Sequence, residues 1–175
     1  MHFALAAAME MLSKRYERCT AAYLPHVVRG EIKRAAARLP ALGDALRAPW
    51  LLDYQVTVGD MPVIEQMRED VFGEGDPLAG LGECVVIHMA EQMHLRAGIE
   101  DRAAHELAKR RKVRAFRALH VLQVLHRYCG FTKGEVRDLY HRLRDGSGAA
   151  GSRLISLPNY SDTKLEKYLS RRDEN

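Results

Sequence analysis

The sequence contains little cysteine and no long apolar run. Only three of its 175 residues are cysteines, Cys19, Cys84 and Cys129. Their number is odd and they form no Cys-x-x-Cys pair, so neither a disulfide framework nor a cysteine-based zinc site is expected. The apolar run at the N-terminus is too short for a signal peptide, and no stretch approaches the roughly 18 apolar residues of a membrane span. We therefore expect a cytoplasmic protein with no membrane contact.

Signatures of common catalytic and cofactor sites are also missing. The chain has no P-loop, no dinucleotide-binding glycine fingerprint and no Gly-x-Ser-x-Gly element. We therefore expect no cofactor, no bound metal and no catalytic activity. The composition of the chain, with 47% hydrophobic and 29% charged residues, is typical of a globular protein.

Apolar residues recur at helical spacing over most of the chain, and strand-like alternation is scarce. This pattern predicts an all-α protein in which residues 1–145 form a bundle of about five to seven helices. We expect helices over residues 3–23, 27–39, 61–72, 84–95, 100–129 and 133–144, a short helical turn over 41–47, and no internal repeat. Asp60 is the expected N-cap of 61–72, with Pro62 in the first turn, and Thr132 is the expected cap of 133–144.

Residues 50–58 form the one strand-like segment of the sequence, since Trp50, Tyr54 and Val58 mark an almost continuous apolar and aromatic run. Because no partner strand is evident, we favour an extended connector that packs Trp50 on the core. Pairing with another chain is the alternative.

The C-terminal region begins with a Gly/Ser/Ala-rich flexible linker over residues 146–152, followed by a docking segment over 153–175. Its terminal helix is capped by Ser161 and carries Leu165, Tyr168 and Leu169. One amphipathic helix is not stable alone in water, so it must pack on its own bundle or on a partner. Both remain open, and these residues with Trp50 are candidate docking elements.

Positive charge is concentrated in the C-terminal part. Residues 1–100 hold 10 basic and 14 acidic residues, whereas residues 101–175 hold 17 and 9. Such a field attracts polyanions. On a continuous helix over 100–129, Arg110, Arg114 and Arg117 would share one face and could follow several phosphates. The full candidate set for nucleic-acid binding is Lys109, Arg110, Arg111, Lys112, Arg114, Arg117, Arg127, Lys133 and Arg137. A solvated helix face is the structural alternative.

Residues 121–143 also have the outline of a helix-turn-helix, with Gly130 in the turn. Lys133 and Arg137 would lie on its recognition helix, and Val136 and Leu139 would be the buried positions of that helix. His126 departs from that pattern, because a small residue usually stands four positions before the glycine.

Two further patterns give weaker evidence, in this case for an enzyme. Arg114 and His120 have the Arg-x5-His spacing that resembles HEPN-type ribonucleases, although Ala115 replaces the usual polar residue. Glu91 and His94 form a Glu-x-x-His pattern similar to that of ferritin-like di-iron proteins, which need it twice.

Together these patterns predict a non-catalytic helical subunit that binds the nucleic-acid backbone within a bacterial nucleoprotein complex of a defence, replication or mobile-element system. RNA or single-stranded DNA is favoured over sequence-specific duplex DNA, and other subunits of the complex are expected protein partners. The alternatives are a helix-turn-helix regulator, a protein-interaction adaptor or inhibitor, and a HEPN-like ribonuclease. Homo-oligomerisation is left open.

Overall fold

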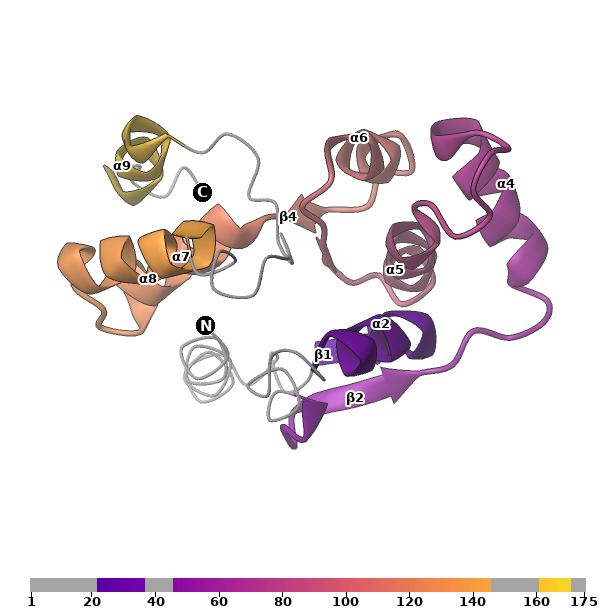
Figure 1. Ribbon diagram of the computed structural model, residues 1–175, viewed down its shortest axis with the longest axis horizontal. Helices are drawn as coiled ribbons and strands as arrows, with labels where there is room; N and C mark the ends of the chain where they lie inside the picture. Colours follow the sequence, from indigo (N-terminus) through magenta and orange to yellow (C-terminus); the bar gives the residue numbers. More distant parts are fainter. Residues whose placement is uncertain (1–21, 37–45, 146–160, 171–175) are drawn as a thin grey trace. The chain divides into compact units, whose positions relative to one another are not determined.

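The computed structural model describes residues 22–36, 46–145 and 161–170, which form a predominantly α-helical structure (Figure 1). The seven described helices are α2 (His26–Ala36), α4 (Met61–Phe72), α5 (Leu81–Gln92), α6 (Arg102–Arg110), α7 (Ala118–Tyr128), α8 (Lys133–Asp145) and α9 (Asp162–Ser170). Four short strands accompany them: β1 (Ala22–Pro25), β2 (Leu51–Tyr54), β3 (Ala97–Gly98) and β4 (Ala115–Phe116). The prediction of a largely helical chain is therefore confirmed.

No helix in these described ranges is long and apolar enough to cross a membrane.

The chain divides into two compact units. We call residues 22–34 and 51–117 the strand unit, because it contains all four described strands. We call the described residues 35–36, 46–50, 118–145 and 161–170 the hairpin unit, which contains α7, α8 and α9. The chain passes from the strand unit to the hairpin unit between Arg117 and Ala118, and the predicted boundary at residue 145 stays a prediction. The predicted linker and the helical segments over 3–21 and 41–45 lie outside the described residues.

The core of the strand unit is formed by residues of α4, α5 and α6. Ile64 from α4 and Cys84 and Ile87 from α5 are fully buried. Burying one such aliphatic side chain contributes roughly 1.5–3 kcal/mol, so the contact between these two helices organises the unit. Helix α4 has the predicted bounds, and Pro62 lies in its first turn as expected.

Strands β1 and β2 correct two predictions. Ala22 and Tyr23, expected at the end of a helix, lie in β1, which pairs in parallel with β2. The segment around residues 51–54 is therefore a strand with a partner in the same chain, not an extended connector. The register joins Ala22 to Leu51 and Pro25 to Tyr54. Periodicity could not reveal this pairing, because the partners are distant in sequence and β1 has only four residues.

The predicted continuous helix over residues 100–129 is wrong. Helix α6 ends at Arg110, the chain then passes through β4, and α7 begins at Ala118. The interruption lies at Lys112, whose φ of 60° is incompatible with a continuing α-helix. Apolar residues at helical spacing on both sides concealed this break.

The hairpin unit has a core of its own. Leu122 of α7, Tyr140 of α8, and Leu165 and Leu169 of α9 are all buried in one cluster. Helix α9 thus packs on its own chain, with α7 as its principal neighbour. Of the two alternatives left open for this helix, packing on its own chain is the one observed, and it covers the apolar surface of Leu165 and Leu169.

The predicted caps of α8 and α9 are present. Thr132 Oγ1 accepts a hydrogen bond from the Glu135 amide at 3.2 Å, and Glu135 in turn accepts one from the Thr132 amide at 2.8 Å. This reciprocal capping box satisfies two amide groups at the start of α8. Ser161 Oγ accepts a bond from the Lys164 amide at 3.3 Å and caps α9 in the same way.

Candidate functional site

The strand unit contains a short internal repeat. Residues 89–98 and 107–116 each comprise the end of a helix, a tight turn and a two-residue strand. Eighteen positions apart, the two segments share Ala90 with Ala108, Arg96 with Arg114, and Ala97 with Ala115. This short similarity was not evident from the sequence alone.

Both copies end their helix with the same hydrogen bonds. The Leu95 amide donates to the Ala90 carbonyl at 2.8 Å, and the Val113 amide donates to the Ala108 carbonyl at 2.8 Å. In each copy the residue just before has a left-handed backbone, with a φ of 54° at His94 and 60° at Lys112. These features define a Schellman motif, which satisfies carbonyl groups left free at a helix end.

The two copies are paired in register. Ala97 of β3 lies opposite Ala115 of β4, and the strands run in parallel. The Ala97 amide donates to the Arg114 carbonyl at 2.9 Å. Neighbouring strands are about 4.8 Å apart, so the pairing places the backbones of Arg96 and Arg114 side by side.

Glycine would be the favoured residue at both left-handed positions. A residue with a Cβ at such a position costs roughly 1–2 kcal/mol of conformational free energy. His94 and Lys112 are both exposed, so packing of their side chains does not explain the choice. Both border the pocket described next. Local rules are most often broken at functional sites, and this double departure from glycine marks the turns as candidates.

An open pocket of about 450 Å³ lies between the two turns. We call it the cationic pocket, and its lining residues are Ala90, Glu91, His94, Leu95, Arg96, Arg111, Lys112, Val113 and Arg114. Most of this lining is polar, and Leu95 is its exposed apolar residue, because Ala90 and Val113 are buried. Its volume lies within the range of small-molecule sites.

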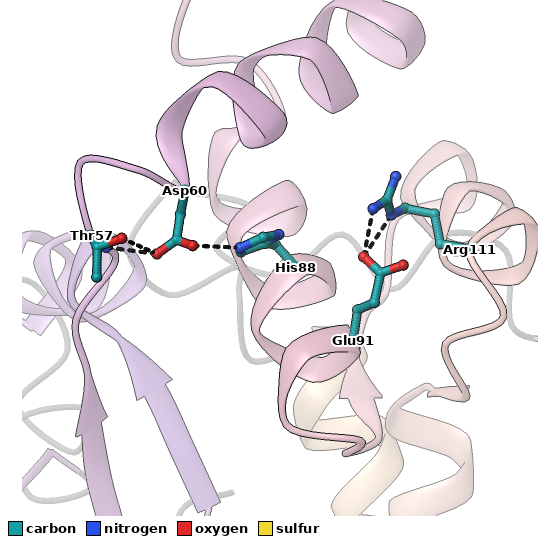
Figure 2. A network of polar contacts seen from close by, with 5 residues as sticks. All are labelled: Thr57, Asp60, His88, Glu91 and Arg111. Carbon is teal, nitrogen blue, oxygen red and sulfur yellow. Dashed lines mark hydrogen bonds and ion pairs between the residues drawn. The ribbon is translucent and has the colours of Figure 1, made fainter.

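Glu91 and Arg111 form an ion pair at this pocket (Figure 2). Arg111 donates from Nε at 2.9 Å and from Nη2 at 2.6 Å to the same Glu91 oxygen, Oε2. Each side chain is 31% exposed, so the pair is neither fully buried nor fully hydrated. Glu91 is the one acidic group among the described lining residues, and it neutralises Arg111.

The remaining charge of the pocket is positive. The side chains of Arg96, Lys112 and Arg114 are exposed and form no hydrogen bond or ion pair with any described residue. The C-terminal ends of α5 and α6 also meet the pocket, and each helix end carries about −0.5 charge. Three uncompensated cations outweigh two such ends by about two positive charges. The pocket is therefore suited to an anion.

The structure separates the predicted phosphate-binding residues. Lys109 and Arg110 are exposed in the last turn of α6, close in sequence to the pocket. Arg117 lies between β4 and α7, where it is half-buried and makes contacts of its own. The predicted face shared by Arg110, Arg114 and Arg117 does not exist, because these residues do not belong to one helix.

The other predicted cations belong to the hairpin unit. Arg127 is half-buried in α7 and also engaged in contacts, and Lys133 is exposed at the start of α8. Arg137 Nε donates to Glu166 Oε1 of α9 at 2.6 Å. This hydrogen bond raises the pKa of Arg137 and lowers the pKa of Glu166. A residue expected to face DNA is thus paired within the chain.

The turn between α7 and α8 retains features of the predicted helix-turn-helix. Gly130 has a φ of 76°, and Val136 is fully buried as expected. His126 does not crowd the turn, because its Nδ1 lies 2.8 Å from the Phe131 carbonyl oxygen and so joins the end of α7 to the turn.

The two enzyme patterns are not assembled. Arg114 lies outside the helices, so the Arg-x5-His spacing does not place Arg114 and His120 on one helix. His120 instead makes an edge-on contact with Tyr168 at 5.1 Å between ring centres. Glu91 is bound to Arg111, and no group of three metal-ligating side chains occurs among the described residues.

Cys84 is also unsuited to nucleophilic chemistry, because its burial raises its pKa to about 11. The thiolate required of a nucleophile is then scarce at neutral pH.

A second polar network anchors the loop before α4 (Figure 2). Asp60 stands at the predicted N-cap position, but its side chain makes no cap hydrogen bond. Instead it accepts bonds from the Thr57 hydroxyl at 2.7 Å and the Thr57 amide at 2.8 Å, and it lies 3.0 Å from His88 Nε2. The hydrogen bond from the Thr57 hydroxyl lowers the pKa of Asp60 most, followed by those from the Thr57 amide and His88. Together they bring this pKa to about 2.

Sequence reasoning missed Arg96 and did not connect His94 with the cationic run. A comparison of the sequence with itself at an offset of 18 residues would have aligned Arg96 with Arg114 and His94 with Lys112. The similarity covers about ten positions with three identities, which is too little to identify a repeat from sequence. It becomes significant because the structure pairs the two turns.

Comparison with known proteins adds no relative to this description: no family model matches the chain, and no curated protein or solved structure is significantly similar to it.

Proposed function

We propose that the chain binds the phosphate groups of nucleic acid through the cationic pocket, as a non-catalytic component of a larger nucleoprotein complex. The observation that carries this proposal is the in-register pairing of β3 with β4. It gathers Arg96, Lys112 and Arg114 at one pocket in which Glu91 already neutralises Arg111.

Phosphate is the favoured anion because guanidinium groups bind its oxygens in a forked geometry. Lys109 and Arg110, exposed at the end of α6, extend the positive surface beyond the pocket. No base-reading arrangement is visible at these turns, so the expected binding is independent of sequence. We favour RNA and single-stranded DNA, because the cations converge on a local pocket rather than on a helix that could enter a major groove.

The proposal predicts how steeply the binding constant should fall with salt. If the three uncompensated cations each contact one phosphate, the slope of log K against log salt is about −2 for a single strand. Each lost contact reduces the steepness by about 0.7.

The test is fluorescence anisotropy of single-stranded RNA, single-stranded DNA and duplex DNA over a range of salt. Arg96→Ala/Arg114→Ala should weaken binding and flatten the slope by about 1.4. The matched control is Arg34→Ala/Arg102→Ala, which removes two exposed positive charges of the same unit at residues that do not line the pocket. Equal losses in both variants would reduce the effect to net charge and count against the pocket.

A second candidate function is duplex-DNA binding by α8, favoured by the Gly130 turn and the capped start of that helix. The Arg137–Glu166 pair opposes it, because Arg137 must leave Glu166 to reach a phosphate. Preference for duplex DNA, lost in Lys133→Ala but kept in Arg96→Ala/Arg114→Ala, would support this function over the pocket.

Absence of binding to all three nucleic acids at low salt would contradict both candidates. The basic surface would then be assigned to an acidic protein partner, as in the adaptor alternative.

A further inference from the structure

The cationic pocket differs from a surface that follows a nucleic-acid strand. Its cations converge on one place, and Leu95 provides apolar surface beside them. Leu95 is 37% exposed although it belongs to a helix-ending turn in which this residue normally packs. A compact ligand with a strongly charged group and a less polar body fits such a pocket better than a continuous backbone does.

The number and position of the cations favour one highly charged phosphate. Arg96 and Arg114 begin from neighbouring strands at the same register, so their guanidinium groups can reach the same anion from two sides. Lys112 lines the same pocket from the left-handed turn just before Arg114. These three donors match the three terminal oxygens of a phosphate monoester, whereas an internal phosphodiester offers two.

Charge gives the same preference. The pocket retains about two positive charges after the two helix ends are counted. A phosphate monoester carries about −1.5 to −2 at neutral pH, and an internal phosphodiester carries one negative charge. The monoester is therefore the better electrostatic match.

We infer that the cationic pocket recognises the terminal phosphate of a nucleic-acid strand, an inference that rests on the proposed function. Arg96, Lys112 and Arg114 bind the phosphate, and Leu95 contacts the terminal nucleotide. Internal phosphates then contribute only through the surrounding surface, including Lys109 and Arg110. A 5′ or a 3′ phosphate would have the same chemistry at the pocket.

The experiment compares three internally labelled single strands of one sequence, bearing a 5′ phosphate, a 3′ phosphate or hydroxyl groups at both ends. We expect one phosphorylated strand to bind at least about tenfold more tightly than the hydroxyl strand, the gain from one further charge-assisted hydrogen bond. The end that gives the gain identifies the terminus. Phosphatase treatment of that strand should abolish its advantage.

Variants separate the pocket from the wider surface. Arg96→Ala and Arg114→Ala should each remove the preference for the phosphorylated strand, whereas Arg102→Ala, at the far end of α6, should keep it. Leu95→Ser should weaken binding of the phosphorylated strand more than binding of the hydroxyl strand.

Failure of this inference is distinct from failure of the proposed function. Equal affinity for the three strands, still reduced by the Arg96 and Arg114 variants, would overturn terminal recognition and leave backbone binding in place. Terminal preference that persists in both variants would overturn the pocket as its site. No binding of any strand at low salt would overturn the proposed function itself.

Discussion

The helix end after α7 in the hairpin unit differs from the ends of α5 and α6 in the strand unit. In the hairpin unit, the left-handed residue after α7 is Gly130, which adopts its φ of 76° without strain. In the strand unit, His94 and Lys112 occupy the equivalent backbone conformation after α5 and α6. The difference teaches that the strand unit tolerates a local cost of roughly 1–2 kcal/mol at each turn, at positions whose side chains line a pocket.

The units also differ in how their basic residues are used. In the hairpin unit, Arg137 is bound by Glu166, and Glu166 also lies near Lys133. In the strand unit, Glu91 engages Arg111 while Arg96 and Arg114 form no side-chain pair with the described residues. Density of positive charge along the sequence is therefore a poor measure of charge that is free to bind a ligand.

The largest effect should follow from removing the anchor of α9. Leu165→Ala deletes a side chain that is 1% exposed and should lower the free energy of unfolding by about 2–5 kcal/mol. Denaturant unfolding gives the size, and hydrogen exchange should place the loss in the hairpin unit alone. Leu78→Ala in the strand unit, where Leu78 is 73% exposed, is the control, with a change within about 0.5 kcal/mol. Equal losses would contradict the assignment of α9 to the hairpin core.

Gly130→Ala should have the next largest effect. A Cβ at this φ costs roughly 1–2 kcal/mol, and no neighbouring atom lies close enough to add a clash. The midpoint of denaturant unfolding should fall accordingly. Gly134→Ala in the first turn of α8 is the control, because alanine is favoured in a helix and the midpoint should rise. An unchanged midpoint for Gly130→Ala would weaken the strain argument for both units.

Lys112→Gly should act in the opposite direction. Relief of the left-handed strain should raise the free energy of unfolding by up to about 1 kcal/mol, while loss of the cation weakens nucleic-acid binding. Lys112→Ala is the matched control, since it loses the same charge but keeps the strained backbone. If Lys112 serves only to stabilise the end of α6, both variants should lower stability and leave binding unchanged.

Acid should affect the strand unit through Asp60. Its pKa in the folded state is depressed from 3.8 to about 2. Asp60 therefore contributes stability that is fully present above about pH 3.8 and is lost as the pH falls through about 2. Asp60→Asn should be less stable at neutral pH and should lose less stability over this window than the wild type. Identical acid unfolding curves for the two proteins would contradict the role of the Thr57–Asp60–His88 network.

The smallest effect on stability should come from Glu166→Gln. The Arg137–Glu166 pair is exposed, and exposed pairs contribute little. The informative measurement is duplex-DNA affinity, which should rise only if α8 is a binding surface that Glu166 masks. Asp138→Asn, which removes an exposed carboxylate of α8 outside its capping box, tests whether a rise reflects net charge alone.

Local patterns explain what could be predicted. Helix α4 was predicted with its bounds, and the caps Thr132 and Ser161 were identified, because capping chemistry acts over three or four residues. Lys112 and Arg114 were also recognised as candidates. The break at Lys112 was not predicted, since lysine rarely adopts positive φ and apolar spacing continues on both sides.

The sequence by itself determined the predominance of helices, the excess of positive charge in the C-terminal part and the caps of α8 and α9, because these depend on composition and on residues near one another. Only the tertiary structure decided the partner of β2, the packing of α9 on α7 and the convergence of Arg96 with Arg114. The physical reason is that strand pairing and core packing join residues distant in the chain, and their free energy comes from burial and hydrogen bonds that no local pattern encodes.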